Sequence, residues 1–290
     1  MAFETLISTT ELAPHVQNPD WAILDCRFSL EEPDLGLQTY VASHIPGALY
    51  VHLEHDLCGP IHPGQGSRHP FPPVEAFAER LSAWGIDTSV QVVVYDDFQG
   101  GIAVRLWRML GWLGHRSVAL LDGGWPRWVE EGRPVRTGPE MRPARTFVPS
   151  PRPELLVSTD EVLQLLASPS HLVLDTRSDR SYTGQRNPSS PTSGHIPGAR
   201  NMHFADNVAP DGLMRDMAEL SSIYRSILGG RPAGQVIAYC TSGVTASLNI
   251  LVMQHLGLGE ARLYAGSWDE WTTHPNRPVE KLTPDPKRTA

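Results

Sequence analysis

The chain repeats itself, and this repetition constrains its fold more than any single motif does. Within 290 residues, five short blocks recur in the same order, at an offset that changes only between 143 and 151 residues. Two copies of one pattern predict two domains of similar structure, because each copy is long enough to form its own core. The matching blocks are 6–12 and 156–162, 22–27 and 172–177, 44–48 and 195–199, 91–96 and 235–240, and 123–128 and 266–271.

Each copy has the signals of alternating strands and helices. A serine stands three residues before a glutamate at Ser8 and at Ser158, ahead of apolar-periodic residues, and this arrangement starts helices. The runs 22–25 and 172–175 are apolar and end in Asp-x-Arg, which is typical of a buried parallel strand. We therefore predict an α/β protein of two similar domains, each a parallel sheet flanked by helices on both faces. Helical periodicity is present at 74–84, 103–113 and 245–256.

A proline-rich stretch separates the two copies. Five prolines and little apolar periodicity mark residues 138–154, which is typical of a semi-extended linker. The predicted domains are therefore 1–137 and 155–290.

Composition excludes several classes of partner. The net charge is −8 and no run of Lys or Arg is present, which argues against nucleic acid. No segment approaches the roughly 18 apolar residues of a membrane span, and the N-terminus has no signal-peptide pattern. We therefore expect a cytoplasmic protein. The three cysteines, Cys26, Cys58 and Cys240, have no metal-ligand spacing and indicate neither a disulfide framework nor a zinc site.

The two copies differ most where the fourth block ends. The first copy has Asp96 at this position and the second has Cys240. Ligands bind at the carboxyl ends of strands in parallel α/β sheets, so Cys240 stands where chemistry usually occurs. The loop from Thr241 to Thr245 leads into a helix near Ala246, and its amides and the helix N-terminus favour an anionic sulfur. We expect a thiolate of lowered pKa with partial solvent access; the alternative is a buried cysteine that only packs.

These motifs together resemble one family. The loop 240–246, the duplicated His-Ile-Pro-Gly-Ala and the blocks 121–125 and 264–268 are similar to those of tandem rhodanese-like sulfurtransferases, over nearly the whole chain. The resemblance implies a catalytically silent first domain, with Asp96 in place of the nucleophile, and a second domain in which Cys240 forms a persulfide. Sulfane sulfur would pass from a small donor to a thiol or cyanide acceptor, without metal or organic cofactor. A thioredoxin-like reductant is a further candidate partner.

The loop sequence bears on the donor. In this family, thiosulfate sulfurtransferases usually have Cys-Arg-Lys-Gly and 3-mercaptopyruvate sulfurtransferases Cys-Gly-Ser-Gly. Here Ser242 and Gly243 follow Cys240 and Thr241, and no basic residue is present. A doubly charged thiosulfate is best met by cations, whereas mercaptopyruvate needs a hydroxyl near the sulfur. The resemblance thus favours 3-mercaptopyruvate, with Ser242 as the hydroxyl and thiosulfate as the alternative.

The arginines that such a family uses for the donor are displaced in this chain. Ser181 stands where one of them is expected, with Arg180 just before it. The second would fall in 187–193, which contains no arginine. Arg180 and Arg186 are the available substitutes for anion binding, and the alternative for each is an exposed surface arginine.

The first copy is expected to contribute to the site as well. His69, in His-Pro-Phe-Pro, matches a histidine of the family's cleft, although a histidine beside prolines can equally be a turn residue. Cys58 stands where an aspartate would be, with Asp56 close by. The predicted site has Cys240 and Ser242 as catalytic residues and, for binding, Arg180, Arg186, Thr241, Gly243, Val244, Thr245 and His69.

Other residues of the repeated blocks are expected to serve the fold. Asp25 and Asp175 end their strands and should cap a loop or pair with a nearby arginine. Cys26 lies in a strand pattern and is expected to be inert. Four tryptophans hold matching places in both copies, which indicates core packing because a catalytic role need not be duplicated. They are Trp125, Trp128, Trp268 and Trp271.

Two alternative functions have less support from the sequence. Related rhodanese-like folds hydrolyse phosphate esters with a cysteine, five residues and an arginine, but the sixth residue after Cys240 is Ala246, so the phosphate clamp is missing. A non-enzymatic sulfur-delivery or regulatory module is the alternative of another class. The intact Cys240 loop speaks against it.

Overall fold

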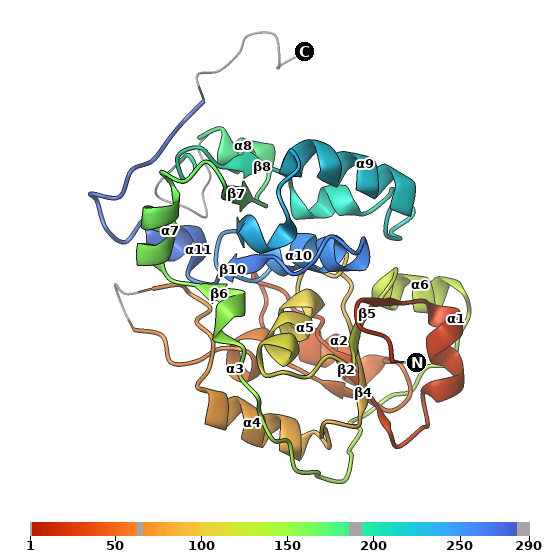
Figure 1. The fold of residues 1–290 in the computed structure, drawn as a ribbon. Coiled ribbons are helices and arrows are strands. Elements are labelled where there is room, and N and C mark those ends of the chain that lie inside the picture. Colours follow the sequence, from red (N-terminus) through yellow and green to blue (C-terminus); the bar gives the residue numbers. More distant parts are fainter. Residues whose placement is uncertain (1, 63–65, 186–192, 283–290) are drawn as a thin grey trace. The chain divides into compact units, whose positions relative to one another are not determined.

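The structure is a computed structural model that describes residues 2–62, 66–185 and 193–282 (Figure 1). The chain forms two compact units, and each takes a short segment from the other half of the sequence. The stretch predicted as a linker, 138–154, belongs to the first unit as far as Pro153. The first unit is Met1–Pro60, Phe71–Pro153 and Val208–Asp216, and the second is Ile61–Pro70, Glu154–Asn207 and Met217–Ala290.

The first unit is built on five parallel strands in the order β1-β5-β4-β2-β3. Its middle strand, β4 (Gln91–Tyr95), is buried along its whole length, which accounts for its unbroken valine-rich sequence. The other strands are β1 (Leu6–Ile7), β2 (Trp21–Asp25), β3 (Ala48–Tyr50) and β5 (Val118–Leu121). The helices are α1 (Thr9–Leu12), α2 (Leu35–Ala42), α3 (Leu53–Asp56), α4 (Val74–Ala83), α5 (Ala103–Trp112) and α6 (Gly124–Glu130), with a 3₁₀ turn at Ala13–His15.

The second unit repeats this topology, with five parallel strands in the order β6-β10-β9-β7-β8. The strands are β6 (Leu156–Val157), β7 (Leu172–Asp175), β8 (Arg200–Asn201), β9 (Val236–Tyr239) and β10 (Arg262–Tyr264). The helices are α7 (Thr159–Leu165), α8 (Asp179–Tyr182), α9 (Met217–Leu228), α10 (Ala246–His255) and α11 (Ser267–Trp271), with 3₁₀ turns at Pro153–Leu155, Phe204–Asn207 and Ala233–Gln235.

Helices cover both faces of each sheet. In the first unit Ile23 and Val93 face Leu12 of α1 and Trp128 of α6, while α5 packs on the opposite face. In the second unit α7 and α11 cover one face and α10 the other. The predicted fold class is therefore confirmed.

The aromatic core follows the prediction from the repeated blocks. Trp128, Trp268 and Trp271 are fully buried, and Trp125 packs against the core of the first unit. The core role expected for these four tryptophans is confirmed. Both predicted helix starts are also present as capping boxes, at Ser8 with Glu11 and at Ser158 with Glu161.

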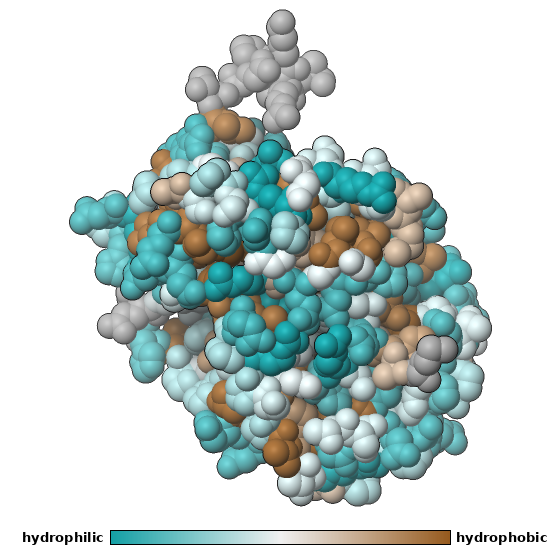
Figure 2. Space-filling model, viewed as in Figure 1, coloured by the Kyte–Doolittle hydropathy of each residue, from teal (hydrophilic) through white to brown (hydrophobic). Residues whose placement is uncertain are grey.

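The surface is mixed in polarity. Exposed apolar side chains include Leu30, Met141 and Val148. On the face shown in Figure 2, hydrophobic areas are interspersed among hydrophilic ones. The helices that the structure describes are too short or too polar to cross a lipid bilayer.

Candidate active site

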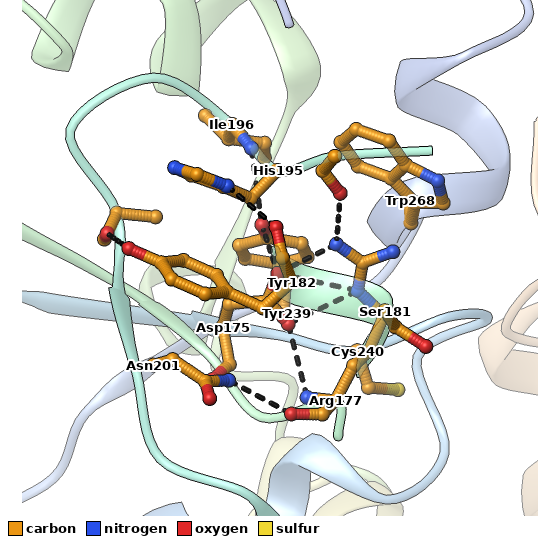
Figure 3. A network of polar contacts seen from close by, with 12 residues as sticks. Asp175, Arg177, Ser181, Tyr182, His195, Ile196, Asn201, Tyr239, Cys240 and Trp268 are labelled. Carbon is orange, nitrogen blue, oxygen red and sulfur yellow. Dashed lines mark hydrogen bonds and ion pairs between the residues drawn. The ribbon is translucent and has the colours of Figure 1, made fainter. Parts of the chain in front are cut away.

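The carboxyl edge of the second sheet is held by a buried ion pair (Figure 3). Asp175, the last residue of β7, accepts hydrogen bonds from Arg177 Nε at 3.0 Å and Nη2 at 2.6 Å. Tyr239, the last residue of β9, lies opposite Asp175 in the sheet and donates its hydroxyl to Oδ2 at 2.5 Å. Burial raises the pKa of Tyr239 well above its usual value, so this hydroxyl remains a donor.

This network also fixes the His-Ile-Pro-Gly block. Arg177 Nη2 donates to the Gly194 carbonyl at 2.7 Å, and the Ile196 amide donates to the Tyr239 hydroxyl at 3.1 Å. The guanidinium of Arg177 lies 4.3 Å above the Trp268 ring. The residue after Tyr239, which is Cys240, is therefore held by two strands, a loop and α11.

The first unit contains the same network. Asp25 accepts from Arg27 and from the Tyr95 hydroxyl, and Arg27 lies 4.4 Å from the Trp125 ring centroid. The expectation that Asp25 and Asp175 pair with a nearby arginine is confirmed. Because the arrangement occurs in both units, it serves the architecture of the strand ends.

Cys240 lies directly after β9, in a loop that encloses it. Its side chain is 2% exposed. The Gly243 amide donates to Cys240 Sγ at 3.2 Å, the Cys240 amide donates to Ser267 Oγ at 3.2 Å, and the Cys240 carbonyl accepts from the Trp268 amide. The sulfur thus has a fixed position and, among the residues that the structure describes, one backbone donor.

Two details differ from the expectation for this cysteine. Partial exposure was expected, whereas the loop buries the residue. A ring of loop amides was also expected, but in the described structure the amides of Thr241, Val244 and Thr245 make no hydrogen bond to the sulfur. The physical reason is the left-handed turn at Gly243, which directs that one amide to Sγ.

The loop leads into α10 as predicted. α10 begins at Ala246, and its N-cap Thr245 makes no side-chain capping bond. The first-turn amides of α10 therefore lack the side-chain acceptor that usually satisfies them. A helix end of this kind favours negative charge nearby.

Gly243 is required by the loop for two reasons. Its φ is +78°, and a Cβ would stand 2.2 Å from the Ala265 carbonyl oxygen. We expect Gly243→Ala to displace the amide that contacts Cys240 and to lower kcat/KM for sulfur transfer by about 100-fold, as small misplacements of reacting groups do. Steady-state kinetics would measure this.

Gly257 provides the matched control for that variant. It also has a positive φ, +69°, but nothing lies within 4 Å of its Cβ position. Gly257→Ala therefore adds backbone strain of about 1 kcal/mol without a clash, and it should leave kcat/KM unchanged. Equal losses in the two variants would contradict a specific role for Gly243.

Ser242 and His69 come together in the second unit. His69 Nδ1 lies 2.7 Å from Ser242 Oγ, and both residues are buried. Ser67 Oγ donates to the Ser242 carbonyl at 2.9 Å and accepts from the His69 amide at 3.1 Å. A serine hydroxyl paired with an imidazole can relay a proton, and this serine lies two residues after Cys240.

Of the two arginines predicted for anion binding, Arg180 is described by the structure, and it makes no contact with this loop among the described residues. Arg180 is exposed on α8, and its guanidinium has no hydrogen-bond or ion-pair partner among the described residues. Ser181, at the position expected for an arginine, is buried with its hydroxyl 3.2 Å from Ser178 Oγ. Arg186 lies outside the described residues.

The comparison with known proteins identifies the chain. The profile of the rhodanese-like domain matches residues 8–131 and 158–274. This chain belongs to the rhodanese-like sulfurtransferase family.

Relatives cover the chain almost completely. A protein of Pseudomonas aeruginosa named "Probable 3-mercaptopyruvate sulfurtransferase" is 40% identical over 280 residues, 96% of this chain and 99% of the relative. Thiosulfate sulfurtransferase of Bos taurus is 30% identical, over 93% of this chain and 92% of the relative. The solved structure of 3-mercaptopyruvate sulfurtransferase from Leishmania major has a TM-score of 0.83 and 29% identity, over 93% of this chain and 74% of that one.

The first rhodanese-like domain holds a carboxylate where the second holds sulfur. Asp96 directly follows β4 and accepts four backbone hydrogen bonds at 2.8 Å. Burial raises the pKa of Asp96 more than these bonds lower it. The strand-end loop in this rhodanese-like fold can therefore surround an acidic group with amides. The donors are the amides of Phe98, Gly100, Ile102 and Ala103.

Three residues that contact the site in the second rhodanese-like domain were not predicted from the sequence. Ser67 and Arg68 precede His69, and nothing in their pattern distinguishes them from turn residues. Ser267 offered a signal, because Gly124 stands at the matching place in the first copy. Both have a φ near +54°, at +54° for Ser267 and +53° for Gly124, a conformation that is costly for a serine. Ser267 is held there by its hydroxyl bonds to Cys240 and Tyr264.

The other two cysteines are in different surroundings. Cys26 is fully buried, and burial raises its thiol pKa well above the usual value. Cys58 is partly buried, its Sγ donates to the Leu53 carbonyl at 3.2 Å, and burial raises its pKa as well. Both effects suppress the thiolate that sulfur chemistry needs.

Proposed function

We propose that Cys240 receives sulfur from 3-mercaptopyruvate as a persulfide and passes it to a thiol or cyanide acceptor. The observation that supports this most is the contact between Ser242 and His69, two residues from Cys240, at 2.7 Å. The loop has no cation for a doubly charged donor, but it has a hydroxyl and an imidazole that can move a proton.

The first half-reaction balances without a further reagent. The Cys240 thiolate attacks the donor sulfur, the carbon–sulfur bond breaks, and its electron pair passes to the carbon. That carbon needs a proton to leave as pyruvate, and the donor thiol has one to lose. Ser242 Oγ and His69 Nδ1 transfer this proton from sulfur to carbon. Cys240 is left as the persulfide anion.

The second half-reaction returns the enzyme to its starting state. A thiolate or cyanide attacks the terminal sulfur, and the Cys240 thiolate leaves. The Gly243 amide donates to Cys240 Sγ and stabilises this sulfur when it leaves as the thiolate. The loop amides of Thr241, Val244 and Thr245 are available to the terminal sulfur of the persulfide. A thioredoxin-like reductant is a proposed acceptor.

The first domain is proposed to be catalytically silent. The Asp96 carboxylate occupies the position of the nucleophile and its oxygens are bonded to backbone amides. A carboxylate cannot form a persulfide. A cytoplasmic location stays a prediction.

A donor comparison tests the proposal. We expect a higher kcat/KM with 3-mercaptopyruvate than with thiosulfate, and a Cys240 peptide that gains the mass of one sulfur atom after donor treatment. Ser242→Ala should lower kcat with 3-mercaptopyruvate by about 100-fold, because proton transfer contributes at least this much. With thiosulfate it should change little, because sulfite leaves without a proton.

Ser67→Ala is the matched control. Ser67 contacts the Ser242 carbonyl and the His69 amide but offers no route for the proton. Its removal should change both donor reactions by a similar small factor. A Ser242→Ala variant that loses both reactions equally would exclude the proton relay, and faster transfer from thiosulfate in the wild type would favour the alternative donor.

A further inference from the structure

Mercaptopyruvate carries a carboxylate, and Arg180 makes no contact with the Cys240 loop among the described residues, while Arg186 lies outside them. If the proposed function holds, this group needs a cation close to the loop. Arg177 cannot serve, since its side chain is buried against Asp175 and Trp268. Among the described residues, Arg68 is held near the loop by contacts on two sides.

We propose that Arg68 binds the carboxylate of the sulfur donor and so determines donor specificity. This inference rests on the proposed function. Nothing in the family patterns found in the sequence marks Arg68, which precedes His69 in Ser-Arg-His-Pro.

Arg68 is placed by its neighbours on one side. Ser67 donates to the Ser242 carbonyl and His69 contacts the Ser242 hydroxyl, so the backbone around Arg68 lies against the loop two residues after Cys240. Ser67 and His69 are both buried, whereas the Arg68 side chain is 53% exposed. The guanidinium is therefore at the rim of the loop and accessible to a small anion.

Asp269 places the guanidinium on the other side. Arg68 Nε lies 2.8 Å from Asp269 Oδ2, and the Asp269 amide donates to the Thr241 carbonyl at 2.9 Å. Arg68 is thus linked through one residue to the neighbour of Cys240. The Asp269 contact orients the planar guanidinium at Nε. Nη1 and Nη2 have no partner among the described residues.

These features favour specific binding of a carboxylate over long-range attraction of any anion. Asp269 neutralises much of the long-range charge of Arg68, so distant anions gain little. At short range the guanidinium still presents N–H donors in a fixed plane, which matches the two oxygens of a carboxylate. A donor without a carboxylate should gain nothing from Arg68.

The first test compares two donors that differ in this group, 3-mercaptopyruvate and mercaptoacetone. Arg68→Gln should lower kcat/KM for 3-mercaptopyruvate by about 10- to 100-fold, as loss of a charged hydrogen-bonded pair does, mainly through KM. Transfer from mercaptoacetone should stay within about twofold. Arg68→Lys should fall between, because lysine keeps the charge and loses the planar fork.

The matched control is Arg180→Gln, which removes an exposed arginine of the same unit. It should leave both donors unchanged. Equal loss of both donors in Arg68→Gln would mean that Arg68 only positions His69, and a donor-specific loss in Arg180→Gln instead would assign the carboxylate to Arg180. Either result overturns the proposal. If the wild type transfers sulfur from neither donor, the proposed function itself fails, and this is evident before any Arg68 variant is made.

A second measurement does not depend on turnover. Iodoacetate and iodoacetamide alkylate the same thiol, but only the first carries a carboxylate. Following the Cys240 peptide by mass spectrometry, we expect Arg68→Gln to slow alkylation by iodoacetate by about 10-fold and to leave iodoacetamide unchanged. An unchanged ratio of the two rates would contradict a cation at this position.

Discussion

Replacing Cys240 by serine is expected to abolish sulfur transfer, with kcat falling by a factor on the order of 10⁴ or more, as when other catalytic nucleophiles are removed. A serine hydroxyl does not ionise near neutral pH and cannot hold a second sulfur as a persulfide. The fold should be retained, because serine is of similar size and its oxygen can accept the Gly243 amide. Sulfur transfer to cyanide would measure the loss of activity, and far-UV circular dichroism would show whether the fold is retained.

Cys58→Ser is the matched control for this variant. Cys58 is a partly buried thiol of the first unit, and burial raises its pKa. This variant should keep wild-type transfer and wild-type persulfide labelling at Cys240. Substantial activity in Cys240→Ser, or loss of activity in Cys58→Ser, would exclude Cys240 as the sole sulfur carrier.

Removal of the Asp175 carboxylate should cause a large loss of folding stability. Asp175→Ala leaves Arg177 buried without its ion-pair partner, and loss of one member of a buried pair costs about 3–5 kcal/mol. The Tyr239 hydroxyl loses its acceptor at the same time. We expect a lower urea midpoint, followed by intrinsic fluorescence, and a reduced kcat because Tyr239 precedes Cys240.

The variant Asp25→Ala separates the loss of stability from the loss of kcat. Asp25 makes the same ion pair with Arg27 in the first unit, where Asp96 stands at the place that Cys240 holds in the second. It should lower the urea midpoint to a similar extent but leave kcat per folded molecule near the wild-type value. If Asp175→Ala unfolds at the wild-type midpoint, the ion pair contributes no net stability.

Much of the fold was predictable because its signals are local and duplicated. The blocks around Asp25 and Asp175 indicated buried strands, and the strand sequence of β4 reports burial on both faces. The exchange of segments 61–70 and 208–216 between the units has no local signal. Such an exchange depends on which distant surfaces a loop can pack against, and short loop sequences do not encode this.

For the candidate site, the sequence by itself determined which residue is proposed to carry sulfur, and its place at a strand end. The contrast between Asp96 and Cys240 at equivalent strand ends suffices for this, because a parallel sheet brings strand ends to one edge. Only the tertiary structure decided which groups surround Cys240. His69 reaches Ser242 of the loop across 173 residues of sequence, and Arg68 reaches Asp269 of α11 across 201. The Gly243 amide reaches the sulfur through a left-handed turn. Side-chain contacts over such separations depend on how the loops pack, so no periodicity or spacing in the chain could have shown them.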